Sequence, residues 1–444
     1  MTATIDTRVA PPPDARSHWI EEWEPENPAF WEAKGKKIAR RNLVFSILSE
    51  HVGFSVWTMW ASLVLFLGPA YGFTPADKFL LTSTPALVGS LVRIPYTFAI
   101  ARFGGRNWTV VSALLLLLPL TATLLVLEPG VSLGTLMLVG ALAGVGGGNF
   151  ASSMTNINAF YPDRLKGRAL GLNAGGGNLG VAAVQLVALL VLATAGKAHP
   201  KLLVGIYLPL VVVAALMAWL AMDNLAHMQN DKRGMRDVMK DKHTWVMSLL
   251  YIGTFGSFIG FGFAFGQVLQ VQFKSDFPTP LDAAYLTFIG PLVGSFIRPV
   301  GGWLADHLGG ARVTLVNFVM MGAAASVVLV ASKQHSLPLY LVGFISLFVF
   351  SGVGNGSTYK MIPAIFKATR PTFHEARRMS GALIGLAGAI GAFGGVLVNV
   401  AFRQSFLSSG KADSAYVAFI AFYAVCVLVT WFVYLRPGKR LTGV

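Results

Sequence analysis

The sequence alternates long apolar stretches with short polar segments, and this pattern predicts membrane-spanning helices. A helix that crosses the hydrocarbon core of a bilayer needs about 20 predominantly apolar residues. Twelve stretches of the chain have this character. They are residues 42–69, 76–101, 108–127, 132–160, 169–195, 202–222, 244–273, 282–305, 312–332, 338–366, 379–402 and 414–435. The pattern therefore predicts an all-α integral membrane protein with twelve transmembrane helices.

The composition supports a membrane protein and excludes several other classes. Hydrophobic residues make up 54% of the chain and charged residues only 12%, whereas soluble domains carry about 25% charged residues. The single cysteine, Cys426, cannot form an internal disulfide, and the eight histidines are scattered. We therefore expect neither a metal nor a cofactor. The spans also lack the acid–base pair or nucleophile arrangement of an enzyme, and the polar tails are too short for the output domain of a sensor.

The net charge of +15 is distributed unevenly over the predicted loops. If both termini face the cytoplasm, 25 of the 35 Lys and Arg residues lie in cytoplasmic loops and tails, and 7 lie in outer loops. Such a bias is typical of the positive-inside orientation. We therefore expect a multi-pass protein of the cell (inner) membrane, in contact with the lipid bilayer and with both termini cytoplasmic. We also expect a monomer. Because topology explains the basic excess, no nucleic acid is expected as a partner.

The longest and most charged loop lies between the sixth and seventh spans and divides the chain into two halves. The predicted organisation is a cytoplasmic N-terminal tail (1–41), an N-terminal six-helix half (42–222), a cytoplasmic linker (223–243), a C-terminal six-helix half (244–436) and a cytoplasmic C-terminal tail (437–444). Within the first tail, the segment from Pro28 to Arg41 has two interpretations. It lies as a helix on the membrane surface, or it is solvated and anchored by Phe30 and Trp31.

The two halves repeat each other. Gly89-Ser-Leu-Val-Arg93 in the second span matches Gly294-Ser-Phe-Ile-Arg298 in the eighth, and the arginines are 205 residues apart. The fourth and tenth spans carry glycine-rich segments around Asn149 and Asn355, 206 residues apart. Two pseudo-symmetric six-helix halves, with a binding site between them near mid-membrane, are characteristic of major facilitator carriers. The repeat therefore predicts the major facilitator fold.

Arg93 and Arg298 are the most informative residues, because both lie within predicted spans at equivalent depths. A guanidinium does not deprotonate in proteins, and an arginine at the bilayer centre costs about 2.5–3.5 kcal/mol on insertion scales. No Asp or Glu lies near them in the same spans, so we expect a transported anion as their partner. The alternative is that each arginine hydrogen-bonds backbone carbonyls and braces its helix. The planar guanidinium favours planar oxyanions such as carboxylate, nitrate, nitrite and bicarbonate.

Several motifs resemble the nitrate/nitrite porter family of the major facilitator superfamily. The region Gly144–Gly180 contains Gly-Gly-Gly-Asn-Phe-Ala-Ser-Ser-Met and Leu-Gly-Leu-Asn-Ala-Gly-Gly-Gly-Asn-Leu-Gly, and it is similar to the first nitrate-signature region of that family. Ser351–Lys360 and Gly381–Gly395 are similar to the counterparts of that region in the second half, and Thr254–Phe261 is similar to the seventh span. The resemblance extends over about residues 40–436.

The resemblance implies a secondary transporter of nitrate and nitrite that works by alternating access. In the family, arginines on the second and eighth spans hold the anion between the halves, and these positions match Arg93 and Arg298. The resemblance also implies polar pocket residues and aromatic walls, at Asn178, Tyr251, Phe150 and Phe255. Additional pocket positions are expected in the glycine-rich motifs, at Asn149, Asn355, Gly175 and Gly385.

The coupling mode is open between two alternatives. Two fixed positive charges repel across an empty cavity, so an anion that bridges them favours exchange of nitrate for nitrite over uniport. The alternative is a proton-coupled symporter of nitrate or another small anion. In that case Glu50 and His51, near the inner end of the first span, would exchange protons. At that depth the two side chains could equally reach water.

The remaining charged motif lies at the inner end of the eighth span. Residues 302–312 resemble the loop motif of the superfamily, which implies a conformational latch through Asp306 and Arg312. The alternative is that these charges only follow the positive-inside rule. Lys360, in the inner part of the tenth span, is expected to extend toward water.

Overall fold

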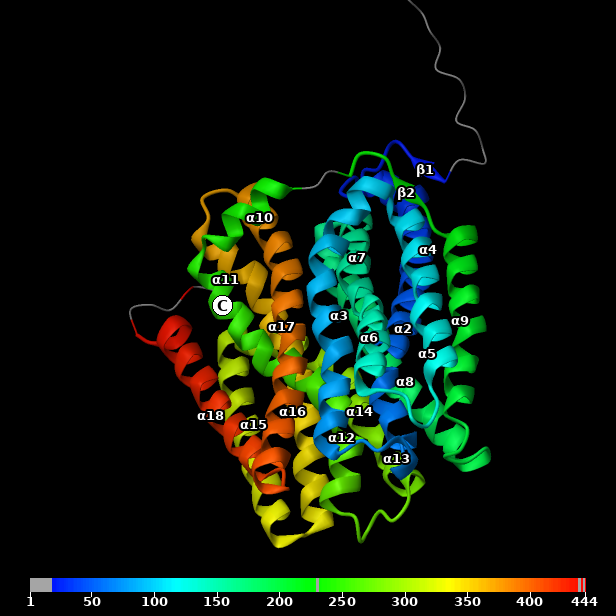
Figure 1. Ribbon diagram of the computed structural model, residues 1–444. Helices are drawn as coiled ribbons and strands as arrows, with labels where there is room; N and C mark the ends of the chain where they lie inside the picture. The colour runs from blue at the N-terminus through cyan, green and yellow to red at the C-terminus, as the bar shows by residue number, and fades with distance from the viewer. Residues whose placement is uncertain (1–17, 229–230, 438–440, 442–443) are drawn as a thin grey trace, which may run out of the picture.

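The protein forms a bundle of long helices whose axes run in roughly one direction (Figure 1). The computed structural model describes residues 18–228, 231–437, 441 and 444. Two short strands, β1 (Trp19–Ile20) and β2 (Asn224–Leu225), are the only strands within these residues. The predominance of helix agrees with the prediction from the apolar pattern.

The N-terminal half contains six membrane-crossing segments. Two of them consist of paired helices joined by one residue in helical geometry, so each pair continues as one span. The segments are α2 (Lys36–Phe66), α3 (Pro75–Phe103), α4 (Gly105–Leu115) with α5 (Leu117–Val126), α6 (Leu133–Ala143) with α7 (Val145–Phe160), α8 (Asp163–Thr194) and α9 (Pro200–Ala221).

The C-terminal half repeats this arrangement. In its first span a π-helical turn, Ile252–Gly256, connects two α-helices. The segments are α11 (Lys242–Tyr251) with α12 (Ser257–Gln272), α13 (Pro280–Thr287) with α14 (Ile289–Leu308), α15 (Gly310–Gln334), α16 (Leu337–Thr369), α17 (Phe373–Ser409) and α18 (Asp413–Thr430). Eleven of the twelve described segments are long and apolar enough to cross a membrane, and α2 is the exception because it carries Glu50 and His51.

Thr74 and Thr279 begin the second span of each half with the same local arrangement. Each threonine side chain accepts a hydrogen bond from the backbone N–H of an aspartate three residues later, and that aspartate accepts one from the threonine backbone N–H. These capping boxes are 205 residues apart, the same offset as Arg93 and Arg298. Each arginine therefore lies 19 residues beyond a capped helix start, at a matching depth in its half.

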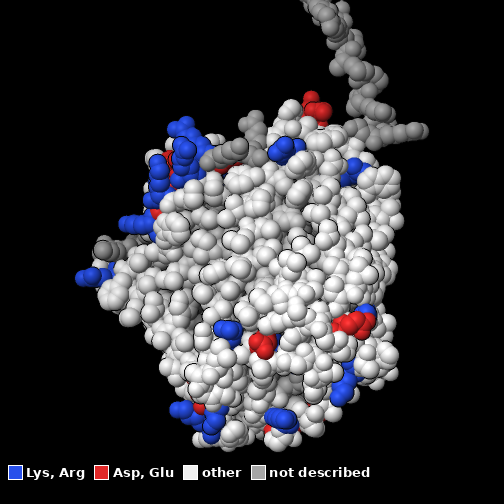
Figure 2. Space-filling view, in the orientation of Figure 1, with Lys and Arg blue, Asp and Glu red and all other residues white. Residues whose placement is uncertain are grey.

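The two ends of the bundle differ in charge and in the elements that they carry. We call the end with α10 (Lys232–Met239) and the β1–β2 pair the linker face, and the other end the opposite face (Figure 1). In Figure 2 the charged side chains gather toward these two ends, with the largest basic group over the linker face. The broad side of the bundle between them is largely uncharged, as expected for a surface that contacts lipid.

A close helix crossing holds the wall of the N-terminal half together. A Cβ atom placed on Gly147 of α7 would lie 2.8 Å from the Cα atom of Gly89 on α3 and 2.8 Å from the Trp57 ring on α2. Only glycine fits at this crossing. The glycine-rich motif of the fourth span therefore brings α2, α3 and α7 close together.

The segment before the first span is helical and packs on the bundle, so it is not a solvated tail. Helix α1 (Pro28–Phe30) and the π-helical turn Trp31–Gly35 continue directly into α2, so the segment extends the helix of the first span. Trp31 is only 1% exposed and packs on Tyr161, with ring centroids 5.6 Å apart. This contact with the loop before α8 buries a side chain that the sequence pattern left open to water or to lipid headgroups.

The linker is attached to both halves. At its start, β2 pairs in parallel with β1, and the Asp223 carboxylate accepts hydrogen bonds from Arg41 (2.6 Å) and Asn42 (2.7 Å). Further along, Asp237 of α10 forms an ion pair with Arg378 of α17 at 2.7 Å. The first part of the linker is therefore held by the N-terminal half and the second part by the C-terminal half.

Candidate functional site

Arg93 is fully buried where α3 meets the C-terminal half. Its Nε donates a hydrogen bond to the Gly147 carbonyl oxygen at 3.0 Å, and its Nη1 donates one to the Gly388 carbonyl oxygen at 2.9 Å. Among the described residues, its Nη2 atom has no hydrogen-bond partner although it is buried. Backbone carbonyls therefore hold the guanidinium, as the bracing alternative expected, but one donor group stays available.

Arg298 occupies the equivalent position on α14 and is 5% exposed. Its Nη2 donates a hydrogen bond to the Tyr251 hydroxyl at 3.3 Å, while its Nη1 has no partner within the described part of the chain. The Cζ atom lies 5.4 Å from the ring centroid of Tyr359. Both arginines thus keep one unpaired terminal nitrogen, and a buried unpaired donor of a charged group is costly unless a ligand completes it.

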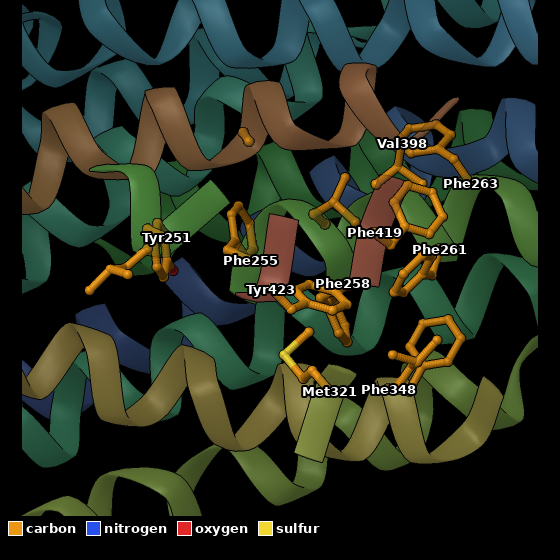
Figure 3. Close-up of a cluster of buried hydrophobic side chains, with 14 of the residues drawn as sticks. Tyr251, Phe255, Phe258, Phe261, Phe263, Met321, Phe348, Val398, Phe419 and Tyr423 are labelled. Atoms are coloured by element: carbon orange, nitrogen blue, oxygen red, sulfur yellow. The ribbon is translucent and has the colours of Figure 1, made fainter. Parts of the chain in front are cut away.

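Aromatic side chains from both halves enclose the guanidinium of Arg93. Its Cζ atom lies 4.7 Å from the ring centroid of Phe150 and 5.0 Å from that of Phe255. The two rings stack on each other at 5.9 Å, and Tyr251 stacks on Phe255 at 5.2 Å. Figure 3 shows Tyr251 and Phe255 at one end of the buried aromatic cluster of the C-terminal half. These walls exclude water and strengthen electrostatic contacts inside the site.

Five of the residues expected to bind substrate come together here: Arg93, Arg298, Tyr251, Phe150 and Phe255. The structure adds Tyr359, whose ring lies 5.0 Å from that of Tyr251. It also adds the backbone carbonyl of Gly388, which accepts a hydrogen bond from Arg93. The sequence could not identify this group, because a backbone carbonyl oxygen has no sequence signature. Tyr359 follows the glycine-rich motif of the tenth span directly, and this position is the only signal that could have identified it.

The predicted asparagines are buried on the helices around this site. Asn149, Asn178 and Asn355 are at most 3% exposed, and none of their side-chain amide atoms has a hydrogen-bond partner among the described residues. The Asn149 amide lies beside α2, since a Cβ atom on Gly53 would be 2.5 Å from its Nδ2. Its side chain therefore fills the α2–α7 crossing.

The two predicted glycines occupy different surroundings. Gly385 lines a cavity between the halves, whereas a Cβ atom on Gly175 would have no neighbouring atom within 4 Å. The cavity has a volume of about 400 Å³, and its lining includes Phe150 and Tyr359 together with Asp231 and Arg378 of the linker face. The cavity therefore extends from the aromatic residues of the arginine site toward the linker face.

The opposite end of the interface is closed. Phe79 of α3 stacks on Phe402 and Phe406 of α17, with ring centroids 5.5 and 5.3 Å apart. Beside them the Thr82 hydroxyl donates a hydrogen bond of 2.9 Å to the Asn399 side-chain oxygen. All of these contacts join the N-terminal half to the C-terminal half. The structure therefore separates the site from the opposite face.

Glu50 and His51 lie on α2 near the site. The Glu50 side chain is only 1% exposed, so it does not reach water as one interpretation expected. Its carboxylate accepts hydrogen bonds from Ser153 of α7 and from Asn173 of α8, the latter at 2.7 Å. His51 is partly exposed, and its Nδ1 lies 3.1 Å from the Gly176 carbonyl oxygen.

The two residues expected to form a latch have different environments. Asp306 forms an ion pair with Lys360 of α16 at 2.6 Å, and both side chains are about half exposed. Arg312 is exposed at the start of α15. A pair that joins the two halves lies elsewhere on the linker face, between Asp163 and Arg377 at 3.4 Å.

Comparisons with known proteins agree with this architecture. The family model of the Major Facilitator Superfamily matches residues 51–399 of this chain. The nitrate/nitrite transporter NarU of Salmonella typhimurium is 38% identical over 95% of this chain and 96% of its own length. The probable nitrate/nitrite antiporter NarK2 of Thermus thermophilus is 34% identical over 96% of this chain and 98% of its own length.

A solved structure shows the same fold. A bacterial homolog of the human lysosomal transporter Spinster, in an inward-facing and occupied conformation, matches with a TM-score of 0.65 at 15% identity, over 88% of this chain and 95% of its own. The predicted major facilitator fold is therefore confirmed. The chain belongs to the nitrate/nitrite porter family of the major facilitator superfamily.

Proposed function

We propose that the protein transports nitrate and nitrite across the cell membrane by alternating access, with the anion bound between Arg93 and Arg298. The observation that carries this proposal is the pair of buried guanidinium groups, one from each half, that each keep an unpaired terminal nitrogen. The names of the relatives from Salmonella typhimurium and Thermus thermophilus support the same substrates.

The dimensions and chemistry of the site favour a small planar anion. The unpaired nitrogens belong to planar guanidinium groups, whose N–H donors suit the coplanar oxygens of nitrate or nitrite. Phe150, Phe255 and Tyr251 surround the donors closely and leave little room for a bulky substituent. Asn178 supplies a further unpaired amide on α8, and we propose it as an additional donor.

The arrangement also favours exchange. Without an anion, two positive charges face each other across the interface, and their repulsion opposes the approach of the halves. A bound anion removes this repulsion, so the loaded carrier reorients more easily than the empty one. The six-helix halves, 42–222 and 244–436, would move as units, with the linker face in the cytoplasm as the positive-inside rule indicates. The pair Asp163–Arg377 joins the two halves and would separate or form during this motion.

Counterflow in proteoliposomes tests the proposal. The purified protein is reconstituted into vesicles loaded with unlabelled nitrite, with equal pH on both sides, and labelled nitrate is added outside. We expect rapid uptake into loaded vesicles and little uptake into empty ones. External nitrite should compete with the label, whereas acetate should not. Equal competition by small carboxylates would contradict nitrate and nitrite as the substrates and would support a carrier of organic anions.

A further inference from the structure

Glu50 is a buried carboxyl group in a site whose other charges are positive. Ser153 and Asn173 donate hydrogen bonds to its Oε2 atom, while Oε1 has no partner among the described residues. A Cβ atom on Gly177 would lie 2.2 Å from Oε1, so the backbone of α8 packs directly on the carboxyl group. Three helices of the N-terminal half therefore form a closed compartment around one acidic side chain.

This compartment adjoins the anion site. Ser153 lies three residues after Phe150 on α7, and Phe54 lies four residues after Glu50 on α2. These spacings place each pair on one helix face. The rings of Phe150 and Phe54 lie 4.7 and 5.9 Å from Arg93 Cζ. Along α2 and along α7, the carboxyl group is thus about one helical turn from the aromatic ring that contacts the Arg93 guanidinium.

The titratable and charged groups that face Glu50 come from four helices. Arg93 of α3 and Arg298 of α14 both interact electrostatically with the Glu50 carboxylate, and so does the phenol of Tyr359 on α16. His51, its neighbour on α2, is directed to the Gly176 carbonyl. Within the described residues, no cation makes direct ionic contact with Glu50. Its charge therefore interacts with the anion site across a short distance instead of being neutralised locally.

We propose that Glu50 is the proton-binding site through which transport of the anion is coupled to protons. This inference rests on the proposed function. A proton from water adds to the carboxylate as the anion binds between the arginines, so the charge in the site does not change. Both are released on the other side, where the proton returns to water. The carboxylate then offsets part of the arginine charge, and the empty carrier can return.

The proposal makes exchange and symport two modes of one carrier. Exchange needs only the loaded carrier, and Glu50 can then keep its proton throughout the cycle. Net uptake needs the empty carrier to return, and this step requires the deprotonated carboxylate. One proton moves with one anion, so net uptake is electroneutral and follows the pH gradient. Anion and proton binding must also favour each other equally, because thermodynamic coupling is reciprocal.

The test separates the two modes in the same vesicles. Counterflow is measured at equal pH, and net nitrate uptake into anion-free vesicles is measured with an acidic exterior. For Glu50→Gln we expect counterflow near the wild-type rate and a loss of net uptake of about tenfold or more. Glu128→Gln is the matched control, because Glu128 pairs with Lys201 on the opposite face, far from the site. This control should keep both activities, and Glu50→Asp should restore part of the pH-driven uptake.

A binding measurement on the wild-type protein completes the test. Addition of nitrate to purified protein in weakly buffered detergent solution should cause proton uptake, detected with a pH indicator, of up to one proton per anion bound. Nitrate binding without proton uptake would overturn the role of Glu50, and so would pH-driven accumulation by Glu50→Gln. A wild-type protein without counterflow would instead contradict the proposed function.

Discussion

Arg93 of the N-terminal half donates a hydrogen bond of 2.9 Å to the carbonyl oxygen of Gly388 in the C-terminal half. A second bond, from Nε to Gly147, fixes the plane of the guanidinium within its own half. The arginine therefore joins the halves and presents its remaining nitrogen in a defined direction. Its planar geometry is as important for this role as its charge.

Replacement of Arg93 by lysine should abolish most transport although the charge is retained. A lysine ammonium cannot reach both carbonyls and the anion with the geometry of a planar fork. We expect nitrate counterflow to fall by at least about tenfold, which corresponds to about 1.4 kcal/mol. Arg298→Lys should behave similarly. Counterflow of labelled nitrate in proteoliposomes, normalised to the amount of reconstituted protein, measures the effect.

Arg102→Lys is the matched control for the arginine variants, because Arg102 is exposed at the end of α3. It should transport like the wild type. Normal counterflow by Arg93→Lys would exclude a requirement for the guanidinium, and the site would then need only a positive charge.

Gly147→Ala should destabilise the protein and weaken transport together. The added methyl group meets the backbone of Gly89 and the ring of Trp57 at 2.8 Å, and overpacking of this kind costs about 1–3 kcal/mol. It also displaces the carbonyl that binds Arg93. Thermal unfolding of the purified protein, followed by counterflow, measures both effects. At Gly322, where a Cβ atom meets nothing within 4 Å, the same substitution should leave both unchanged or raise stability slightly.

Phe402→Ala should weaken closure at the opposite face. Phe402 stacks on Phe79 across the interface, and an aromatic pair contributes about 0.5–1.5 kcal/mol beyond its buried area. A cysteine introduced at Thr82, which is fully buried at this contact, reports access from that side. Its labelling by a membrane-impermeant thiol reagent should be up to about tenfold faster when Phe402 is alanine. The native Cys426 is buried and gives the background. Equal labelling rates would show that the aromatic stack does not hold this face closed.

Trp31→Ala should lower stability but leave the transport mechanism intact. Trp31 is 1% exposed and packs on Tyr161, and truncation of such a side chain costs about 3–5 kcal/mol. The thermal midpoint should fall clearly, while the protein that remains folded exchanges nitrate normally. Trp431→Ala, at a position that is 45% exposed, should have a much smaller effect. If the thermal midpoint of Trp31→Ala falls as little as that of Trp431→Ala, the N-terminal segment contributes little to stability.

The arginines could be identified from the sequence, whereas the full surroundings of the site could not. An internal repeat and the cost of a buried guanidinium are both visible in one chain, and they led to Arg93 and Arg298. Glu50 is 43 residues from Arg93 in the sequence. The inference that the arginines need an anion as partner considered acidic residues only in the spans that carry the arginines. The approach of α2 to α7 depends on how helices pack, so the burial of Glu50 appears only in three dimensions.

The N-terminal segment shows the same difference between local pattern and packing. Its aromatic pair suggested either a helix on the membrane surface or an anchored tail in water, because no local signal indicates that Tyr161 covers Trp31. The capping boxes at Thr74 and Thr279 show the opposite case. Their residues are adjacent in the sequence, so the signal was available, and it would have reinforced the repeat.

The division of the linker between the halves has a consequence for how the molecule can be assembled. The chain up to Ala226 is held by β1, Arg41 and Asn42, and α10 is held by Arg378. The covalent connection between Ala226 and Asp231 is therefore not needed to keep either piece in place. Two separate polypeptides, produced together in one cell and divided at this point, should find each other in the membrane and reconstitute the carrier, since α3 and α17 supply the mutual recognition surface.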